Sequence, residues 1–115
     1  MLNVTANAVG DVATLRLEGD IDEDGANALR VALVKCLRDK QHNVVVNMTG
    51  VKFISYMGVG ILVERLRQFR ANEGDMKLVG LNLYTQRLFR MVGVTTLFET
   101  FESESQAIQR YRRAA

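Results

Sequence analysis

The sequence feature that most constrains the fold is the run Val44-Val45-Val46 near the middle of the chain. These β-branched residues favour an extended strand, and the run lacks the alternation of apolar and polar residues that a half-exposed strand shows. A strand without alternation is typical of a parallel sheet that is covered on both faces. The run therefore predicts an α/β fold, with this strand continuing through residues 48–51 to residues 53–54.

The first half of the chain supplies partners for this strand. Residues 2–8 and 12–17 predict two short strands, and Val9-Gly10-Asp11 between them has the composition of a hairpin turn. A helix follows, because an apolar stripe lies at Ala26, Leu29, Leu33, Cys36 and Leu37.

The second half repeats the alternation of helices and strands. A second helix ends near Gly74, a strand covers residues 76–79, a third helix stops at Gly93, and a last strand covers residues 95–99. Ser103 and Gln106 form a capping box that opens a final helix. The order predicts a single domain over residues 1–115, with a mostly parallel, mixed sheet of four to five strands and about four helices. The inward positions expected on the second helix are Val59, Leu62, Val63, Leu66 and Phe69, and the third helix is predicted from the apolar residues Tyr84, Leu88, Met91 and Val92.

Composition and charge exclude several classes of function. The net charge of +2 and the absence of aromatic residues among the arginines argue against binding to nucleic acid. The longest apolar run, residues 57–63, is too short to insert into a membrane, and the single cysteine fits a cytoplasmic protein. One histidine, His42, leaves neither a catalytic triad nor a zinc site, so we expect no catalytic residue, metal or cofactor.

Two motifs have a chemical and a structural interpretation. Asp20, Asp22, Asp24 and Gly25 match the start of a calcium loop, but Val31 replaces the glutamate that such a loop needs at its twelfth position. We therefore interpret these acids as the negatively charged start of a helix. Gly58-Val59-Gly60 lacks the remaining residues of a phosphate-binding loop, and we interpret its glycines as small residues at a close-packed helix start.

Residues 47–62 resemble the central motif of the STAS domain, the fold of bacterial anti-sigma factor antagonists. Val51-Lys52-Phe53-Ile54 matches the family's Val-x-Phe-Ile, and Gly58 matches the glycine of its Asp-Ser-Ser-Gly. Residues 17–22, 77–81 and 91–98 are similar to three further family segments in the right order. The resemblance implies a STAS fold and a protein without enzymatic activity.

The resemblance also implies a mechanism called partner switching. Such a protein binds an anti-sigma factor or related serine kinase through the loop and helix after the third strand. The kinase phosphorylates the first serine of Asp-Ser-Ser-Gly, which separates the pair, and a phosphatase of the PP2C type resets it. Added charge and bulk at a docking helix explain the separation.

This chain departs from the family where that chemistry occurs. Asn47 replaces an upstream aspartate, Ser55 the motif aspartate, Tyr56 the phosphorylated serine and Met57 the second serine. Three hypotheses follow: the switch residue is lost and the protein is a constitutive binder or scaffold, Ser55 is the new phosphorylation site, or the domain serves a different system. We favour the first.

The resemblance places a partner-binding surface at the start of the second helix, with Asp22 and Glu23 at its rim. Replacing Gly58 with a β-branched residue is expected to weaken partner binding without unfolding the domain. Two other functions remain open: an accessory subunit of a lipid-transport ABC system, and a module that senses a small ligand or nucleotide. The oligomeric state is also open, and a homodimer is compatible with the sequence. The residues assigned to the surface are Asp22, Glu23, Ser55, Tyr56, Met57, Gly58, Val59 and Arg65.

Overall fold

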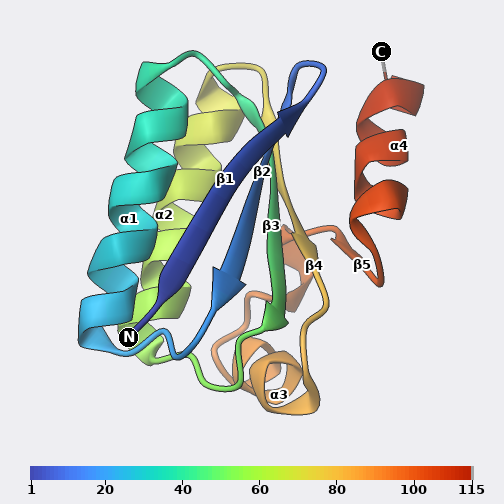
Figure 1. Ribbon diagram of the computed structural model, residues 1–115. Coiled ribbons are helices and arrows are strands. Elements are labelled where there is room, and N and C mark those ends of the chain that lie inside the picture. Colours follow the sequence, from blue (N-terminus) through green and yellow to red (C-terminus); the bar gives the residue numbers. More distant parts are fainter. Residues whose placement is uncertain (115) are drawn as a thin grey trace.

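A five-stranded sheet with the strand order β1-β2-β3-β4-β5 forms the centre of the computed structural model (Figure 1), which describes residues 1–114. The four helices and the strands alternate along most of the chain, as the sequence predicted. Their bounds are β1 Asn3–Val9, β2 Val12–Glu18, α1 Glu23–Arg38, β3 Asn43–Gly50, α2 Tyr56–Ala71, β4 Asp75–Val79, α3 Leu83–Met91, β5 Thr100–Phe101 and α4 Glu104–Ala114, with a 3₁₀ turn at Thr95–Leu97.

The sheet is mixed because its first two strands form a hairpin. Strands β1 and β2 are antiparallel, and Val9 pairs with Val12 across a turn in which Gly10 has a φ of 61°. The pairs β2–β3, β3–β4 and β4–β5 are all parallel. The carboxyl ends of these four strands therefore lie at one end of the sheet, which is where α3 lies in Figure 1.

Helices cover both faces of the central strand, which explains why Val44-Val45-Val46 does not alternate. Val44 and Val46 belong to the main core under α1 and α2. Val45 points to the other face and joins a second apolar cluster with Val12, Val79 and residues of α4. Figure 1 shows α4 on the opposite side of the sheet from α1 and α2. All three valines are fully buried.

Three predicted boundaries were wrong. Residues 95–97 form the 3₁₀ turn, and the last strand is the short pair Thr100–Phe101, so the predicted strand at 95–99 was displaced. Strand β3 ends at Gly50, and Ile54 forms only an isolated bridge to Ile21. Helix α2 ends at Ala71, and Glu73, with a φ of 64°, takes the left-handed position after it. Gly74 does not end the helix but allows a close approach of two backbone segments. A Cβ at this position would clash with the backbone oxygen of His42, so no larger residue fits there.

Polar contacts fix both ends of α4 to the sheet. Near its start, Glu104 accepts hydrogen bonds from Arg16 (2.8 and 3.0 Å) and from Asn47 (2.8 Å). Near its end, the Tyr111 hydroxyl accepts a hydrogen bond from the Val44 N–H and lies 2.7 Å from two backbone carbonyl oxygens. Burial raises the pKa of the Tyr111 phenol, which therefore keeps its proton and can donate it.

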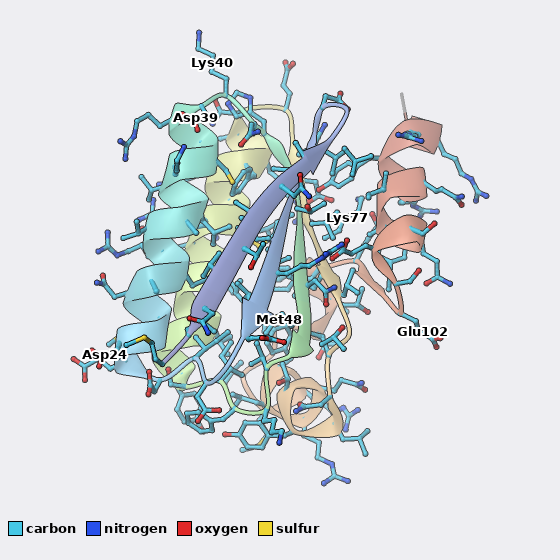
Figure 2. The ribbon with its side chains drawn as sticks, viewed as in Figure 1. Asp24, Asp39, Lys40, Met48, Lys77 and Glu102 are labelled. Carbon is cyan, nitrogen blue, oxygen red and sulfur yellow. The ribbon has the colours of Figure 1, made fainter. Side chains whose placement is uncertain are left out.

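Lys77 provides a buried charge beneath the same helix. Its ammonium donates to Asp75 (2.9 Å) and Glu99 (2.7 Å), and it lies 4.5 Å from the centre of the Tyr111 ring. Figure 2 shows the Lys77 side chain between the sheet and α4. Because its charge is paired and covered by an aromatic ring, Lys77 can be buried at a modest cost.

The contacts of α4 predict that the protein loses stability in acid. The hydrogen bond from Arg16 lowers the pKa of Glu104, and the hydrogen bond from Lys77 lowers the pKa of Glu99. A carboxylate with a depressed pKa in the folded state stabilises the fold above its unfolded pKa, and this contribution is lost as the pH falls through the folded value. We expect the free energy of unfolding to decrease below about pH 4.5, measured by urea unfolding in a pH series. Glu104→Gln should flatten this decrease, and an unchanged pH profile in that variant would contradict the assignment.

Candidate partner-binding site

Two loops at the carboxyl end of the sheet are joined by backbone hydrogen bonds. The Ile21 N–H donates to the Phe53 oxygen at 2.8 Å, and the Ser55 N–H donates to the Ile21 oxygen at 2.8 Å. This pairing brings the start of α1, which contains Asp22 and Glu23, next to the start of α2. The structure thus places these two acids beside the residues from Ser55 onward.

Each of the two helices begins at a side-chain cap. Asp22 Oδ1 accepts a hydrogen bond from the Gly25 N–H at 2.8 Å, as expected for a helix start rather than a calcium ligand. Ser55 Oγ accepts one from the Gly58 N–H at 3.1 Å. The hydroxyl of Ser55 therefore serves the first turn of α2, and its side chain is half-buried.

The Ser55 cap leads to a stability prediction. Removal of the hydroxyl in Ser55→Ala leaves an amide of the first turn unpaired and is expected to lower the free energy of unfolding by about 1 kcal/mol. Urea denaturation measures this change, and Ser55→Asp is the matched variant because aspartate also caps helices. A Ser55→Ala variant as stable as the wild type would show that the cap contributes nothing.

The two glycines of Gly58-Val59-Gly60 have different surroundings. Gly58 is buried, and a Cβ there would lie 2.7 Å from Ile21 Cγ2 and 2.8 Å from Ile54 Cγ1. Val59 is also buried, with 4% of its surface exposed. Gly60 is exposed, and a Cβ there would meet nothing within 4 Å. The interpretation of both as close-packed residues therefore holds for Gly58 and was wrong for Gly60.

Exposed apolar side chains gather around this helix start. Of the ten large apolar residues that are exposed in residues 1–114, seven lie in the β3–α2 loop, in the first turn of α2 or on α3 and its C-cap. Tyr56 is 66% exposed and Met57 52%. We call these seven the apolar surface; they are Phe53, Tyr56, Met57, Leu83, Tyr84, Met91 and Val92.

Side-chain contacts hold the two parts of the apolar surface together. The rings of Phe53 and Tyr84 stack with their centres 5.7 Å apart. The Asn82 side chain, which caps α3, donates to the backbone oxygens of Val51 (3.3 Å) and Lys52 (3.1 Å). The start of α3 is therefore fixed to the loop that precedes α2, and the surface is continuous across both elements.

A groove of about 360 Å³ runs along α2 beside this surface. One wall contains Tyr56, Gly60 and Val63, which are spaced along one face of α2, and the other wall contains Val92 and Val94. Glu64 and Arg67 supply the charges at its edge. The missing side chain of Gly60 helps to keep the groove open.

Arg65 does not join this groove. It lies two residues from Val63 and from Arg67, on another face of α2, and only 15% of its side chain is exposed. Its guanidinium donates to Gln68 at 2.7 Å, while its Nε is buried without a hydrogen-bond partner. The cation of α2 at the groove is Arg67, which lines it together with Glu64.

Part of α3 faces solvent, and the sequence did not predict its place at this site. Tyr84, Met91 and Val92, from which the helix was predicted, are 46%, 75% and 38% exposed, and the residues of α3 that are buried are Thr85, Leu88 and Phe89. Apolar spacing identified a helix but could not identify its buried face, because α3 has apolar residues on two faces.

Residues 1–114 contain no cluster of three or more histidine, cysteine, aspartate or glutamate side chains that could hold a metal ion. Cys36 is buried in the main core, and burial raises the pKa of its thiol, which disfavours the reactive thiolate. The exposed feature of this site is its apolar surface.

Comparison with known proteins identifies the family. The model of the STAS domain family matches residues 3–107. The chain belongs to the STAS domain family. Two curated relatives of this STAS protein are the anti-sigma F factor antagonist of Paenibacillus polymyxa, 21% identical over 84% of each chain, and the anti-sigma-B factor antagonist of Staphylococcus epidermidis, 25% identical over 88% of this chain and 94% of the relative.

Solved structures confirm the STAS fold. A putative anti-sigma factor antagonist from Thermotoga maritima matches with a TM-score of 0.88 and 17% identity, covering 95% of this chain and 94% of that one. An anti-sigma factor antagonist from Mycobacterium paratuberculosis gives a TM-score of 0.87 and 20% identity, covering 97% and 95%. Within residues 1–114, none of the helices has the length and apolar character needed to cross a bilayer.

Proposed function

We propose that this STAS protein is a cytoplasmic anti-sigma factor antagonist that binds an anti-sigma factor or related serine kinase through the apolar surface and the adjoining groove. The gathering of seven exposed apolar residues at one end of the sheet carries the proposal. A single exposed apolar side chain is common on protein surfaces and needs no explanation. A contiguous patch of large side chains such as Tyr56 and Met57 marks a protein–protein contact. Tyrosine is also enriched among the residues that contribute most to such contacts.

The proposed contact does not depend on a phosphoserine switch. Tyr56 occupies the position of the family's phosphorylated serine, and its ring lines the groove instead of presenting a small hydroxyl. The neighbouring Ser55 hydroxyl accepts the hydrogen bond that caps α2. We infer a constitutive complex in which Tyr56 is part of the buried contact. Neither phosphorylation of Ser55 nor a PP2C-type phosphatase is needed in it.

Two arginines at the surface can contact acidic side chains of a partner, whereas Glu64 at the groove can contact a basic one. Arg67 lines the groove, and Arg87 lies on α3 one turn after Leu83 and one turn before Met91. Neither side chain forms a hydrogen bond or ion pair within residues 1–114. Complementary charges at the rim of an apolar contact speed association and fix orientation more than they add affinity.

Affinity co-purification from the native cells tests the proposal. The tagged protein is compared with Tyr56→Ala and with Val31→Ala, a control that truncates an exposed apolar residue of α1 (55% exposed) outside the apolar surface. We expect mass spectrometry to identify an anti-sigma factor or serine kinase with the wild type and Val31→Ala, and its loss with Tyr56→Ala. Capture of a transporter ATPase in its place would overturn the proposal and favour the lipid-transport alternative.

A further inference from the structure

A second cleft lies at the same end of the sheet but on a different side of α3. It has a volume of about 570 Å³, within the range of small-molecule sites, and it lies beyond the ends of β4 and β5. The helix after β4 stays at the end of the sheet, whereas the helix after β5 crosses to the opposite face (Figure 1). In open α/β sheets, ligands commonly bind outside the carboxyl ends of the parallel strands, which is where this cleft lies.

The floor of the cleft is apolar. It contains Phe89 of α3, which is buried with 2% of its surface exposed, together with the half-buried Leu81 and Phe101. Gly80 forms the turn out of β4 with a φ of 75°, and a Cβ there would lie 2.2 Å from Thr49 Oγ1. The backbone therefore passes close to Thr49 of β3 at this point.

One cation and one anion stand at the rim. Arg90 and Glu102 both line the cleft, and neither side chain forms a hydrogen bond or ion pair within residues 1–114. Figure 2 shows Glu102 just before the start of α4, projecting from the protein. These two charges are available to a ligand without the loss of an existing contact.

Two amide side chains are held in place between these charges. Gln86 Nε2 donates to the Leu81 oxygen at 2.9 Å, which leaves its own oxygen as a free acceptor. Gln106 Oε1 accepts from the Glu102 N–H at 3.1 Å, which leaves its amide hydrogens as free donors. Both residues line the cleft. A ligand would therefore meet an acceptor and a donor whose positions are already fixed.

We propose that this cleft binds a free amino acid with an apolar side chain. Arg90 pairs with the carboxylate, Glu102 pairs with the ammonium group, and the side chain lies on Phe89 and Phe101. The pairing of one cation with one anion disfavours nucleotides, since Glu102 repels their phosphates and no second cation lines the cleft within residues 1–114. The cleft shares no lining residue with the groove or with the apolar surface, so binding to each can be tested separately.

Isothermal titration calorimetry of the full chain tests the proposal with L-phenylalanine and L-leucine. We expect saturable binding of at least one of them, and affinity at least about tenfold lower for 3-phenylpropionate and for phenethylamine, each of which lacks one charged group. ATP should give no saturable heat at this site. Equal affinity for phenylalanine and for the two singly charged analogues would overturn the proposal. The absence of saturable binding by either amino acid at about 10 mM would also overturn it, because this concentration is high enough to detect a dissociation constant of about 1 mM.

Variants locate the binding site. Arg90→Gln and Glu102→Gln each remove one exposed charge and should weaken binding at least about tenfold, with unchanged circular dichroism. Arg87→Gln removes an exposed arginine of α3 that does not line the cleft and should bind as the wild type does. Retention of full affinity in both Arg90→Gln and Glu102→Gln would place the ligand elsewhere and overturn the assignment.

Discussion

Replacing Gly58 by valine is expected to destabilise the fold by about 3 kcal/mol, a large part of the stability of a small domain. The new Cβ would lie within 2.8 Å of carbon atoms of Ile21 and Ile54, both of which are fully buried. These side chains connect the loop before α1 to the loop before α2, so they cannot move without disturbing the paired backbone at Ile21. The buried position of Gly58 thus reverses the expectation from the sequence that such a variant keeps its fold.

Thermal and urea unfolding of Gly58→Val measures this effect, with Gly60→Ala as the matched control two residues away. A Cβ at Gly60 would contact nothing within 4 Å, and alanine favours the helix over glycine by roughly 1 kcal/mol. Gly60→Ala should therefore be as stable as the wild type or more stable. Equal stability of Gly58→Val and the wild type would refute the packing described around Ile21 and Ile54.

Filling the groove is expected to abolish most of the partner affinity while the fold remains intact. Gly60→Leu places a large side chain in the groove between Tyr56 and Val63, at a position where the helix has room for it. Tyr56→Ala removes the largest exposed side chain of α2, and the loss of a central tyrosine typically costs about 2 kcal/mol or more, which is roughly a thirtyfold loss of affinity.

Titration of each variant with the purified partner measures these losses, with Val31→Ala as the control for exposed apolar residues in general. The unfolding temperature of Gly60→Leu should stay at or above that of the wild type, which separates blocked binding from a lost fold. Wild-type affinity in both Gly60→Leu and Tyr56→Ala would show that the partner does not use this groove.

The sequence predicted the layers of the fold better than its edges. The run Val44-Val45-Val46 identified the central strand. Both faces of the sheet are covered at this strand, so each residue of the run is apolar whichever face its side chain lies on. Strand β5 was misplaced because it pairs with β4 at only two residues, Thr100 and Phe101, and this pairing leaves almost no periodic signal. The helix boundary at Gly74 was misjudged because this glycine is required by the nearby backbone of His42, a contact that is not local in the sequence.

The candidate site was predicted only in part for a similar reason. The resemblance located the start of α2, where Tyr56 and Met57 are indeed exposed. The contribution of α3 depends on which of its two apolar faces the sheet covers, and the structure was needed to show that Tyr84 and Met91 face outward. Likewise, only the three-dimensional arrangement shows that Arg65 lies away from the groove that Arg67 lines.

Incubation of the purified complex with ATP shows whether partner binding uses the apolar surface without a phosphoserine switch. The measurement combines the affinity of this STAS protein for its co-purified partner, with and without ATP, and the intact mass of the protein. We expect an unchanged mass, an unchanged affinity and a complex that persists. A gain of one phosphate in the peptide that contains Ser55 and Tyr56, accompanied by dissociation, would contradict it.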